Sequence, residues 1–395
     1  MFLRKALFLF LFSVLLLQAQ TLPVVSPETE QMNGKRLQLA DQLIEKAIAD
    51  SIIPGAVLLV ARNNKIVYRK AYGYRQLVPV KRKMEINTIF DMASVTKPVA
   101  TATSAMILLE RGQLRLKDRV SDFLPQFKHP NNFGKPIRII HLLTHTSGLP
   151  PYAPVKELKE KYGAPNPDSL IAYIGRLPLE HEPGTYFKYS CLNFITLQNI
   201  IQTITGQTLK AFSEQNIFQP LGMHDTFFLP PKNKIKRCAA TEMQPDGTVL
   251  LGVVHDPLAR VMNGGISGNA GLFSTADDLA IYSAMMLNGG IFRGKRILSK
   301  RTVEKMISVP RGFEQFGRAL GWDVYSDYNS NLGDLFSDRA YGHTGYTGTS
   351  VSIDPESKTV IILLTNRVHP HDLHGGDIVR LRGRIANIVA SSILN

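Results

Sequence analysis

Apolar, strand-like runs stand near both ends of this 395-residue chain, and helical patterns fill the sequence between them. Near the start, Val57–Val60 and Ile66–Tyr68 suit two strands, and Asn63-Asn64 between them fits a tight hairpin turn. Near the end, GTSVSIDPESKTVIILLTN predicts two more strands around a turn at Asp354-Pro355. This order predicts an α/β (α+β) fold, in which an antiparallel sheet built from both chain ends is flanked by helices and carries a mainly helical inserted region.

The first residues are typical of a secretory signal peptide. Arg4 and Lys5 precede an apolar run, and the small residue Ala19 follows it, which predicts cleavage after residue 19. An uncleaved anchor is the alternative, but it needs roughly 20 apolar residues, more than this run supplies. We therefore expect a bacterial protein that is secreted or periplasmic, with no stable membrane anchor after cleavage.

Residues 20–395 are expected to form one domain, with an α/β part over about 30–90 and 300–395 and a mainly helical part over about 91–299. The formal charge is +14, but the basic residues are scattered in short groups such as VKRK, KNKIKR and RLRGR. A nucleic-acid-binding protein more often concentrates them on one element, with aromatic residues between. No nucleic-acid partner is therefore expected.

The stretch SVTKPVATATSAMILLERG places Ser94 three residues before Lys97, and no other serine in the chain has a lysine at this spacing. Apolar residues then recur at helical spacing until Gly112, which fits a helix C-terminal cap. Pro98 is compatible with a first helical turn. Ser94 should therefore lie at the start of a buried helix, where backbone N–H groups favour an oxyanion. A lysine held there in a partly dry site can lose its proton and act as a base.

Two further motifs follow in order. Tyr189 begins a Y-S-C motif, and His343-Thr344-Gly345 runs into a predicted strand. With LLTHTSGLP, PLGMHDTFF and GLFSTADDLA, they resemble the serine β-lactamase-related family, that is, the class C β-lactamase and DD-peptidase superfamily with its esterase and D-aminopeptidase relatives. The resemblance covers nearly all of the mature chain.

The resemblance implies a role for each motif. Ser94 would be the nucleophile that forms an acyl-enzyme, Lys97 would help to deprotonate it, and Tyr189 would act as general base and then as general acid. The backbone N–H groups of Ser94 and Tyr346 would hold the oxyanion. The resemblance implies no cofactor and no metal. It assigns the substrate and oxyanion contacts to His343, Thr344, Gly345, Tyr346 and Cys191.

This chain departs from the family pattern at two of these positions. Cys191 stands where the family often has an asparagine that contacts the substrate amide, and a thiol is a poor donor. Whether Asn193 takes over that contact is left open. His343 stands where many relatives have lysine, and an ordinary histidine is mostly neutral at pH 7. We therefore expect weak carboxylate anchoring that strengthens from about pH 8 to about pH 6, and a poor β-lactamase.

Other patterns have simpler interpretations. His369, His371 and His374 have metal-like spacing, but HPHDLH reads as a solvated polar loop. GISGN and GGIFRGKR each miss a known hydrolase or phosphate-binding motif by one residue. The pair His255-Asp256 is either cleft-lining or structural. We interpret His145 and Ser147 as loop-shaping residues, and expect Cys191 and Cys238 to be free rather than bridged.

The sequence thus predicts a secreted serine hydrolase that acts through an acyl-enzyme on an amide, ester or β-lactam carbonyl, and that is esterase-like or peptidase-like rather than an efficient β-lactamase. The substrate would be a small molecule or a peptide, peptidoglycan-derived peptides included. The alternative is a non-catalytic ligand-binding or scaffold protein on the same fold. Intact Ser94, Lys97 and Tyr189 favour the enzyme, because a scaffold needs none of them.

Overall fold

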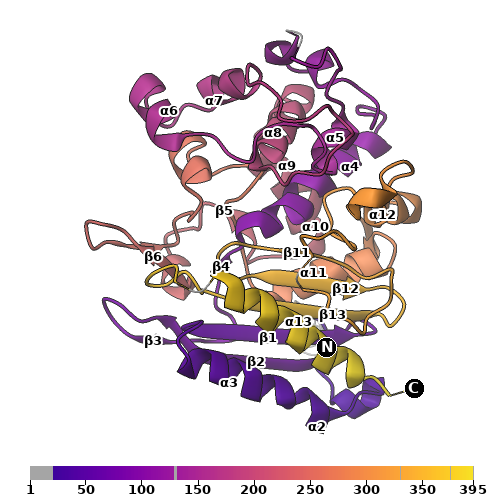
Figure 1. Ribbon diagram of the computed structural model, residues 1–395. Coiled ribbons are helices and arrows are strands. Elements are labelled where there is room, and N and C mark those ends of the chain that lie inside the picture. Colours follow the sequence, from indigo (N-terminus) through magenta and orange to yellow (C-terminus); the bar gives the residue numbers. More distant parts are fainter. Residues whose placement is uncertain (1–20, 129–130, 330, 374, 395) are drawn as a thin grey trace, which may run out of the picture.

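The computed structural model describes residues 21–128, 131–329, 331–373 and 375–394, so the signal peptide predicted over 1–19 lies outside the described residues. The main sheet of the described part has strand order β11-β12-β13-β1-β2-β3, and each neighbouring pair is antiparallel (Figure 1). Its strands are β1 (Gly55–Arg62), β2 (Lys65–Gln76), β3 (Arg82–Lys83), β11 (Tyr341–Thr344), β12 (Ser350–Asp354) and β13 (Thr359–Thr365). The prediction of one antiparallel sheet built from both chain ends is confirmed.

The two chain ends meet at the pairing of β1 with β13, which runs from Ala56 opposite Thr365 to Arg62 opposite Thr359. Both hairpins predicted from the sequence are present. Asn63 and Asn64 join β1 to β2 with φ values of 50° and 62°, the conformation that a tight two-residue hairpin turn requires.

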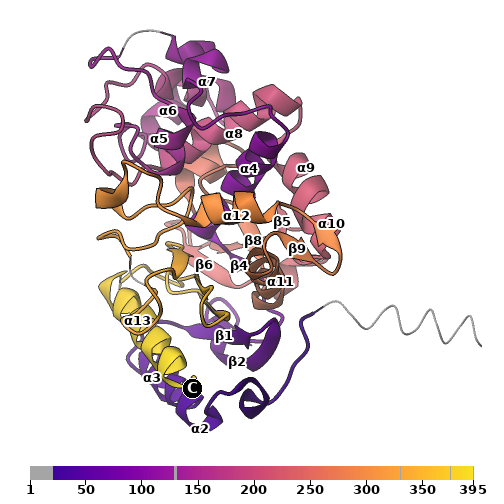
Figure 2. The ribbon, with the colours of Figure 1, turned by 90° about the vertical axis from the view of Figure 1, so that its right-hand side faces the viewer.

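Helices cover both faces of the sheet. Residues that alternate along β1 divide between the two faces, with Leu58 in one apolar cluster and Val57 in the other. The first face is covered by α2 (Gly34–Leu37), α3 (Leu39–Ala49) and α13 (Gly375–Ser391), and the second by α11 (Ala276–Leu287) (Figures 1 and 2). The closing amphipathic helix predicted from the sequence is therefore α13.

The helical region lies beyond the β11 edge of the sheet (Figures 1 and 2). Gly112, with φ +68°, lies just beyond the end of α4 and permits the predicted stop. Thr275 caps α11 by accepting a hydrogen bond from the Asp278 N–H. The helices after β4 are α4 (Thr103–Glu110), α5 (Ile139–Leu143), α6 (Val155–Tyr162), α7 (Pro167–Ile174), α8 (Cys191–Thr205), α9 (Leu209–Ser213), α10 (Gln219–Leu221), α11 and α12 (Lys300–Ile307), the last of which packs against α4.

Short strands connect these helices. They are β4 (Phe90–Asp91), β5 (Phe227–Phe228) and β8 (Leu272–Ser274), which form one small sheet, with β6 (Ala240–Met243), β7 (Val249–Leu251), β9 (Ile291–Phe292) and β10 (Lys295–Arg296) in two hairpins. Among the helices of the described residues, none has the length and apolar character needed to cross a membrane.

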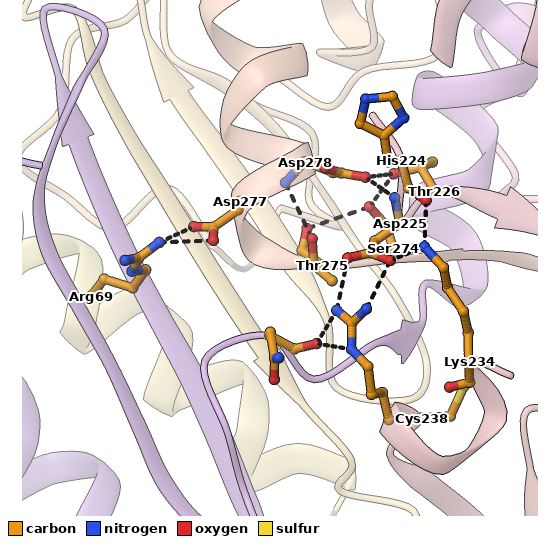
Figure 3. A network of polar contacts seen from close by, with 12 residues as sticks. Arg69, His224, Asp225, Thr226, Lys234, Cys238, Ser274, Thr275, Asp277 and Asp278 are labelled. Atoms are coloured by element: carbon orange, nitrogen blue, oxygen red, sulfur yellow. Dashed lines mark hydrogen bonds and ion pairs between the residues drawn. The ribbon is translucent and has the colours of Figure 1, made fainter. Parts of the chain in front are cut away.

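A buried carboxylate ties the start of α11 to the loop before β5. Asp278 Oδ2 accepts hydrogen bonds from the Asp225 N–H and the Thr226 hydroxyl, each at 2.8 Å (Figure 3). The Asp225 carboxylate is in turn paired with Lys234 and Arg237. Burial raises the pKa of Asp278 to about 7.

This raised pKa should make the folding stability depend on pH. Between about pH 4 and about pH 7 the folded protein keeps a proton on Asp278 that the unfolded chain has lost. The contribution of Asp278 to the free energy of unfolding should therefore fall as the pH rises, by at most roughly 1.4 kcal/mol per pH unit. Asp278→Asn should remove this component, because its amide oxygen still accepts both hydrogen bonds but cannot lose a proton. Urea denaturation at a series of pH values measures the slope.

A suitable control is Asp246→Asn. Asp246 is exposed, and hydrogen bonds from Thr248 hold its pKa below the ordinary value, so it titrates below this pH range. Its substitution should therefore leave the slope between about pH 4 and about pH 7 unchanged. If Asp278→Asn keeps the wild-type slope, Asp278 does not carry the pH dependence.

Candidate active site

Ser94 lies on a tight turn between β4 and α4. Ala93–Val95 form a 3₁₀ turn, which leads through a π-helical turn over Lys97–Ala102 into the α-helix, as predicted for a serine at the start of a buried helix. Pro98 occupies the second position of the π-helical turn. Ala93 has φ +45°, a left-handed conformation that costs roughly 1 kcal/mol in a residue with a side chain.

Asp91 holds this turn, and the sequence analysis missed it. Its carboxylate is 3% exposed and accepts hydrogen bonds from the Ala93 N–H at 2.9 Å and from the His255 N–H at 2.7 Å. Burial raises the pKa of Asp91. A lone aspartate at the end of a short strand carries no motif, so only the folded chain identifies it as a positioning residue.

Lys97 is completely buried and touches three groups of the site. Its Nζ donates to Ser94 Oγ at 2.8 Å and to the Asn269 carbonyl oxygen at 2.9 Å, and it lies 3.6 Å from Cys191 Sγ. The S-x-x-K pair is therefore a real contact, because the helical turn places the two side chains on the same face.

Burial alone would lower the pKa of Lys97, but negative charge on Cys191 and then on Tyr189 favours the ammonium, and the pKa is raised overall. This direction does not support the expected loss of the Lys97 proton, and a role for Lys97 as a base stays a prediction. Burial also raises the pKa of Cys191, in spite of the nearby Lys97. A charged Lys97 can orient the Ser94 oxygen and stabilise negative charge on it.

Tyr189 is held between two rings. The ring of His145 stacks on it at 4.4 Å between centroids, and the ring of Tyr328 stacks at 4.8 Å. Lys97 Nζ lies 4.9 Å from the centre of the Tyr189 ring. Tyr189, Ser94 and Lys97 therefore meet in one site although they come from segments almost 100 residues apart in the sequence.

The end of β11 lies against the Ser94 turn. A Cβ atom at Gly345 would lie 2.4 Å from the Met92 carbonyl oxygen and 2.1 Å from Thr349 Oγ1, so only glycine permits this approach. Thr349 Oγ1 also donates to the Met92 carbonyl oxygen at 3.0 Å. In the described part of the chain, the backbone N–H groups of Ser94 and Tyr346 have no hydrogen-bond acceptor.

These residues surround a cavity of about 960 Å³. Ser94, Tyr189, Cys191, Thr344, Gly345 and Tyr346 line it, and Lys97 lies directly behind Ser94. Further lining side chains include Tyr152, Glu242, His255, Asp256, Tyr328, Arg367, Asp372 and Arg382.

His343 does not have the exposed, substrate-facing position that the sequence predicted for it. It is 3% exposed and is not among the residues that line the cavity. Its Nδ1 lies 2.8 Å from the Thr344 carbonyl oxygen. Burial first, and then Arg318 and Lys97, lower the pKa of His343 well below its ordinary value. The expected strengthening of carboxylate binding from about pH 8 to about pH 6 through this residue is therefore wrong, because the ring stays neutral.

Asn193 does not replace the amide that is absent at Cys191. Its side chain is buried, accepts a hydrogen bond from Ser147 Oγ at 2.5 Å and lies 3.3 Å from His145 Nδ1. Asn193 therefore stabilises the loop that contains His145 and Ser147. These contacts agree with the interpretation of His145 and Ser147 as loop-shaping residues.

The other two histidine motifs, His255-Asp256 and HPHDLH, make contacts with residues far away in the sequence. His255 and Asp256 both line the cavity but have separate partners, Glu242 for His255 and Tyr152 for Asp256. The expectation of a solvated loop is wrong for His369, which is 2% exposed and accepts from the Leu77 N–H at 2.8 Å. His374 of the same motif lies outside the described residues, and within them no cluster of metal-ligating side chains occurs.

Both cysteines are free thiols, Cys191 at the cavity and Cys238 in a small apolar cluster. A denatured, non-reduced monomer should therefore show two reactive thiols. In the native protein alkylation should occur slowly and at Cys191 only, because burial raises the pKa of both thiols and only Cys191 lines the cavity. Mass spectrometry of the alkylated native protein, with Cys191→Ser as control, measures this. A denatured monomer without a free thiol would contradict the structure.

Comparison with known proteins agrees with this arrangement. A family model described as Beta-lactamase matches residues 40–383. An N-acetylmuramyl-L-alanine amidase of Bacillus subtilis (strain 168) is 36% identical over 374 residues, which are 88% of this chain and 84% of that protein.

Two solved structures share the fold. An octameric penicillin-binding protein homologue from Pyrococcus abyssi has a TM-score of 0.66 and 26% identity, and the match covers 84% of this chain and 73% of that one. EstCE1, a hydrolase with promiscuous acyltransferase activity, has a TM-score of 0.72 and 24% identity, and the match covers 90% of this chain and 99% of that one. The fold and the family match together show that this chain belongs to the β-lactamase family of hydrolases.

Proposed function

We propose that this protein is a secreted serine hydrolase that cleaves an amide or ester through an acyl-enzyme on Ser94, with peptidoglycan-derived amides as the first substrates to test. The contact that carries the proposal is the 2.8 Å hydrogen bond from the buried Lys97 Nζ to Ser94 Oγ, at a cavity that Tyr189 also lines. The similarity to an N-acetylmuramyl-L-alanine amidase supports an amide of cell-wall origin.

In this proposal Tyr189 reacts as the phenolate, and Ser94 Oγ attacks the substrate carbonyl carbon while its proton passes to the Tyr189 phenolate oxygen. Lys97, as an ammonium, orients the serine and stabilises the charge that develops on its oxygen. The carbonyl oxygen becomes an oxyanion at the N–H groups of Ser94 and Tyr346. Tyr189 then protonates the leaving amine or alcohol, which leaves the acyl group on Ser94. In the second half of the reaction Tyr189 takes a proton from a water molecule that attacks the acyl carbonyl, and returns the proton to Ser94 Oγ as the acyl group leaves.

Export is a separate part of the proposal. It is supported by the basic and then apolar residues 1–19, which are typical of a signal peptide. N-terminal sequencing of protein recovered from the periplasm or the medium should find a mature chain that begins near residue 20. A full-length chain retained in the cytoplasm would contradict export.

The proposed catalytic roles predict how much turnover each of three variants should lose. Ser94→Ala should abolish both turnover and labelling by a fluorescent acylating probe, because Ser94 Oγ carries the acyl chain in this mechanism. Lys97→Ala and Tyr189→Phe should each lower kcat at least about a hundredfold, the usual effect of lost acid–base help. The measurements are hydrolysis of aryl esters and of N-acetylmuramyl-peptide amides, with circular dichroism to check the fold.

Tyr186→Phe is the matched control for Tyr189→Phe. Tyr186 lies three residues earlier, its side chain is 51% exposed and it does not line the cavity, so its hydroxyl should be dispensable. Turnover that survives Ser94→Ala would refute the serine mechanism. A wild-type protein that binds ligands but is never labelled or turned over would instead favour the non-catalytic alternative.

A further inference from the structure

Tyr328 covers one face of the Tyr189 ring at the cavity. The two rings lie 4.8 Å apart between centroids, and their planes differ by only 6°. This distance and the nearly parallel planes are typical of a stacked aromatic pair. Tyr328 is 51% exposed and is among the residues that line the cavity. It can therefore be substituted without opening a hole in the core.

His145 holds Tyr189 from the other face. Its ring stacks on Tyr189 at 4.4 Å between centroids. Its Nδ1 accepts a hydrogen bond from the Ser190 N–H at 3.2 Å, and its carbonyl oxygen accepts one from the Lys188 N–H at 2.9 Å. The completely buried His145 is thus bonded to both chain neighbours of Tyr189. On this side the fold fixes the backbone as well as the ring.

The loop over residues 323–329, which carries Tyr328, is tied together by its own hydrogen bonds. Asp323 Oδ1 accepts from the Ser326 hydroxyl at 2.8 Å and from the Ser326 N–H at 3.2 Å. Ser326 Oγ in turn accepts from the Tyr328 N–H at 3.3 Å, and the Ser326 carbonyl oxygen accepts from the Asn329 N–H at 2.8 Å. These bonds fix the backbone from which the Tyr328 ring extends.

Asp323 also connects this loop to the segment of Tyr189. Its Oδ2 lies 2.8 Å from Arg318 Nη1, and both side chains are almost completely buried. The guanidinium carbon of Arg318 lies 5.6 Å from the centre of the Phe187 ring and 5.9 Å from the centre of the Tyr189 ring. Breaking a buried ion pair is costly, so the pair holds the loop and the Tyr189 segment in one arrangement.

The orientation of the Tyr189 ring decides whether its hydroxyl can transfer a proton. A general base works only within hydrogen-bond reach of the proton that it takes, and a displacement of about 1 Å can lower the rate about a hundredfold. The hydroxyl is at the far end of the ring, so it moves furthest when the ring pivots about its side-chain bonds. A ring that is stacked on both faces cannot pivot without losing a stack.

We propose that Tyr328 is a positioning residue, which holds the Tyr189 ring in the orientation needed for proton transfer with Ser94. The proposal rests on the hydrolase function proposed above, and in it Tyr328 acts through Tyr189 rather than on the substrate. Among the described residues the Tyr328 hydroxyl has no hydrogen-bond partner. The ring of Tyr328, and not its hydroxyl, therefore performs this role.

Steady-state hydrolysis of an activated aryl ester tests the proposal. Tyr328→Ala should lower kcat about tenfold, the scale of one aromatic stack, and Tyr328→Phe should recover most of this loss because it keeps the ring. KM should change little, because Tyr189 serves both halves of the reaction and both should slow by a similar factor. Tyr325→Ala is the matched control, because Tyr325 is 56% exposed on the same loop and does not line the cavity.

A double-mutant cycle distinguishes positioning from the other roles that Tyr328 could have. Tyr189→Phe lacks the hydroxyl that has to be positioned, so adding Tyr328→Ala to it should change kcat by less than about twofold. If Tyr328 contacts the substrate or only supports the fold, its loss costs about tenfold in either background, which would overturn the proposal. An unchanged kcat in Tyr328→Ala, or a loss in Tyr328→Phe as large as in Tyr328→Ala, would overturn it as well.

A spectroscopic measurement separates this proposal from the proposed function. In protein made with 3-fluorotyrosine, the fluorine NMR signal of Tyr189 is assigned by its absence in Tyr189→Phe. This signal should shift in Tyr328→Ala and return towards its wild-type position in Tyr328→Phe. Such a shift in a protein whose wild type hydrolyses nothing would support the restraint of Tyr189 by Tyr328 and refute the hydrolase. Hydrolysis that depends on Ser94, with the Tyr189 signal and kcat unchanged in Tyr328→Ala, would support the hydrolase and refute the positioning role.

Discussion

The pairing of β1 with β13 is the constraint on which the rest of the structure depends. It joins segments that are about 300 residues apart in the sequence, and β12 and β11 are then added in order beside β13. The last turn of this series, at Gly345, reaches the Ser94 turn, which follows the first strands of the chain. Without the long-range pairing, Ser94 and Gly345 would belong to unrelated parts of the protein. Pairing such distant segments closes a very long loop, and closing a loop lowers the conformational entropy of the chain. The apolar surface buried on both faces of the sheet must offset this loss.

Around Ser94 the fold combines close backbone contacts with buried cations. Gly345 brings the β11 end within contact of Met92, and Asp91 holds Ala93 in a strained conformation. Lys97 lies behind the serine, and Arg318 lies 5.9 Å from the centre of the Tyr189 ring. Both cations lower the pKa of His145 and His343, although burial is the larger cause. Lys97 thus places a positive charge next to the serine oxygen, a setting that favours the anions formed in carbonyl chemistry.

The buried arginines show two ways in which a fold handles charge. Arg318 has its own aspartate, so its charge is compensated whether or not a ligand is present. Arg382 has only carbonyl oxygens as partners, and these stabilise a guanidinium without neutralising it.

The sequence by itself determined the features that depend on local geometry. Asn63-Asn64 specified a hairpin because both residues tolerate positive φ, Gly112 ended a helix, and Ser94 and Lys97 were paired because residues three apart share a face of a helical turn. The tertiary structure alone decided what depends on burial and on distant partners. His343 became a neutral core residue, His369 became a buried acceptor, and Lys97 became a buried cation behind Ser94. Asp91 and Arg382 acquired partners from other segments. A pKa, a ring stack or an unmatched charge is set by atoms that the chain brings together only when it folds, so no spacing in the sequence could have shown them.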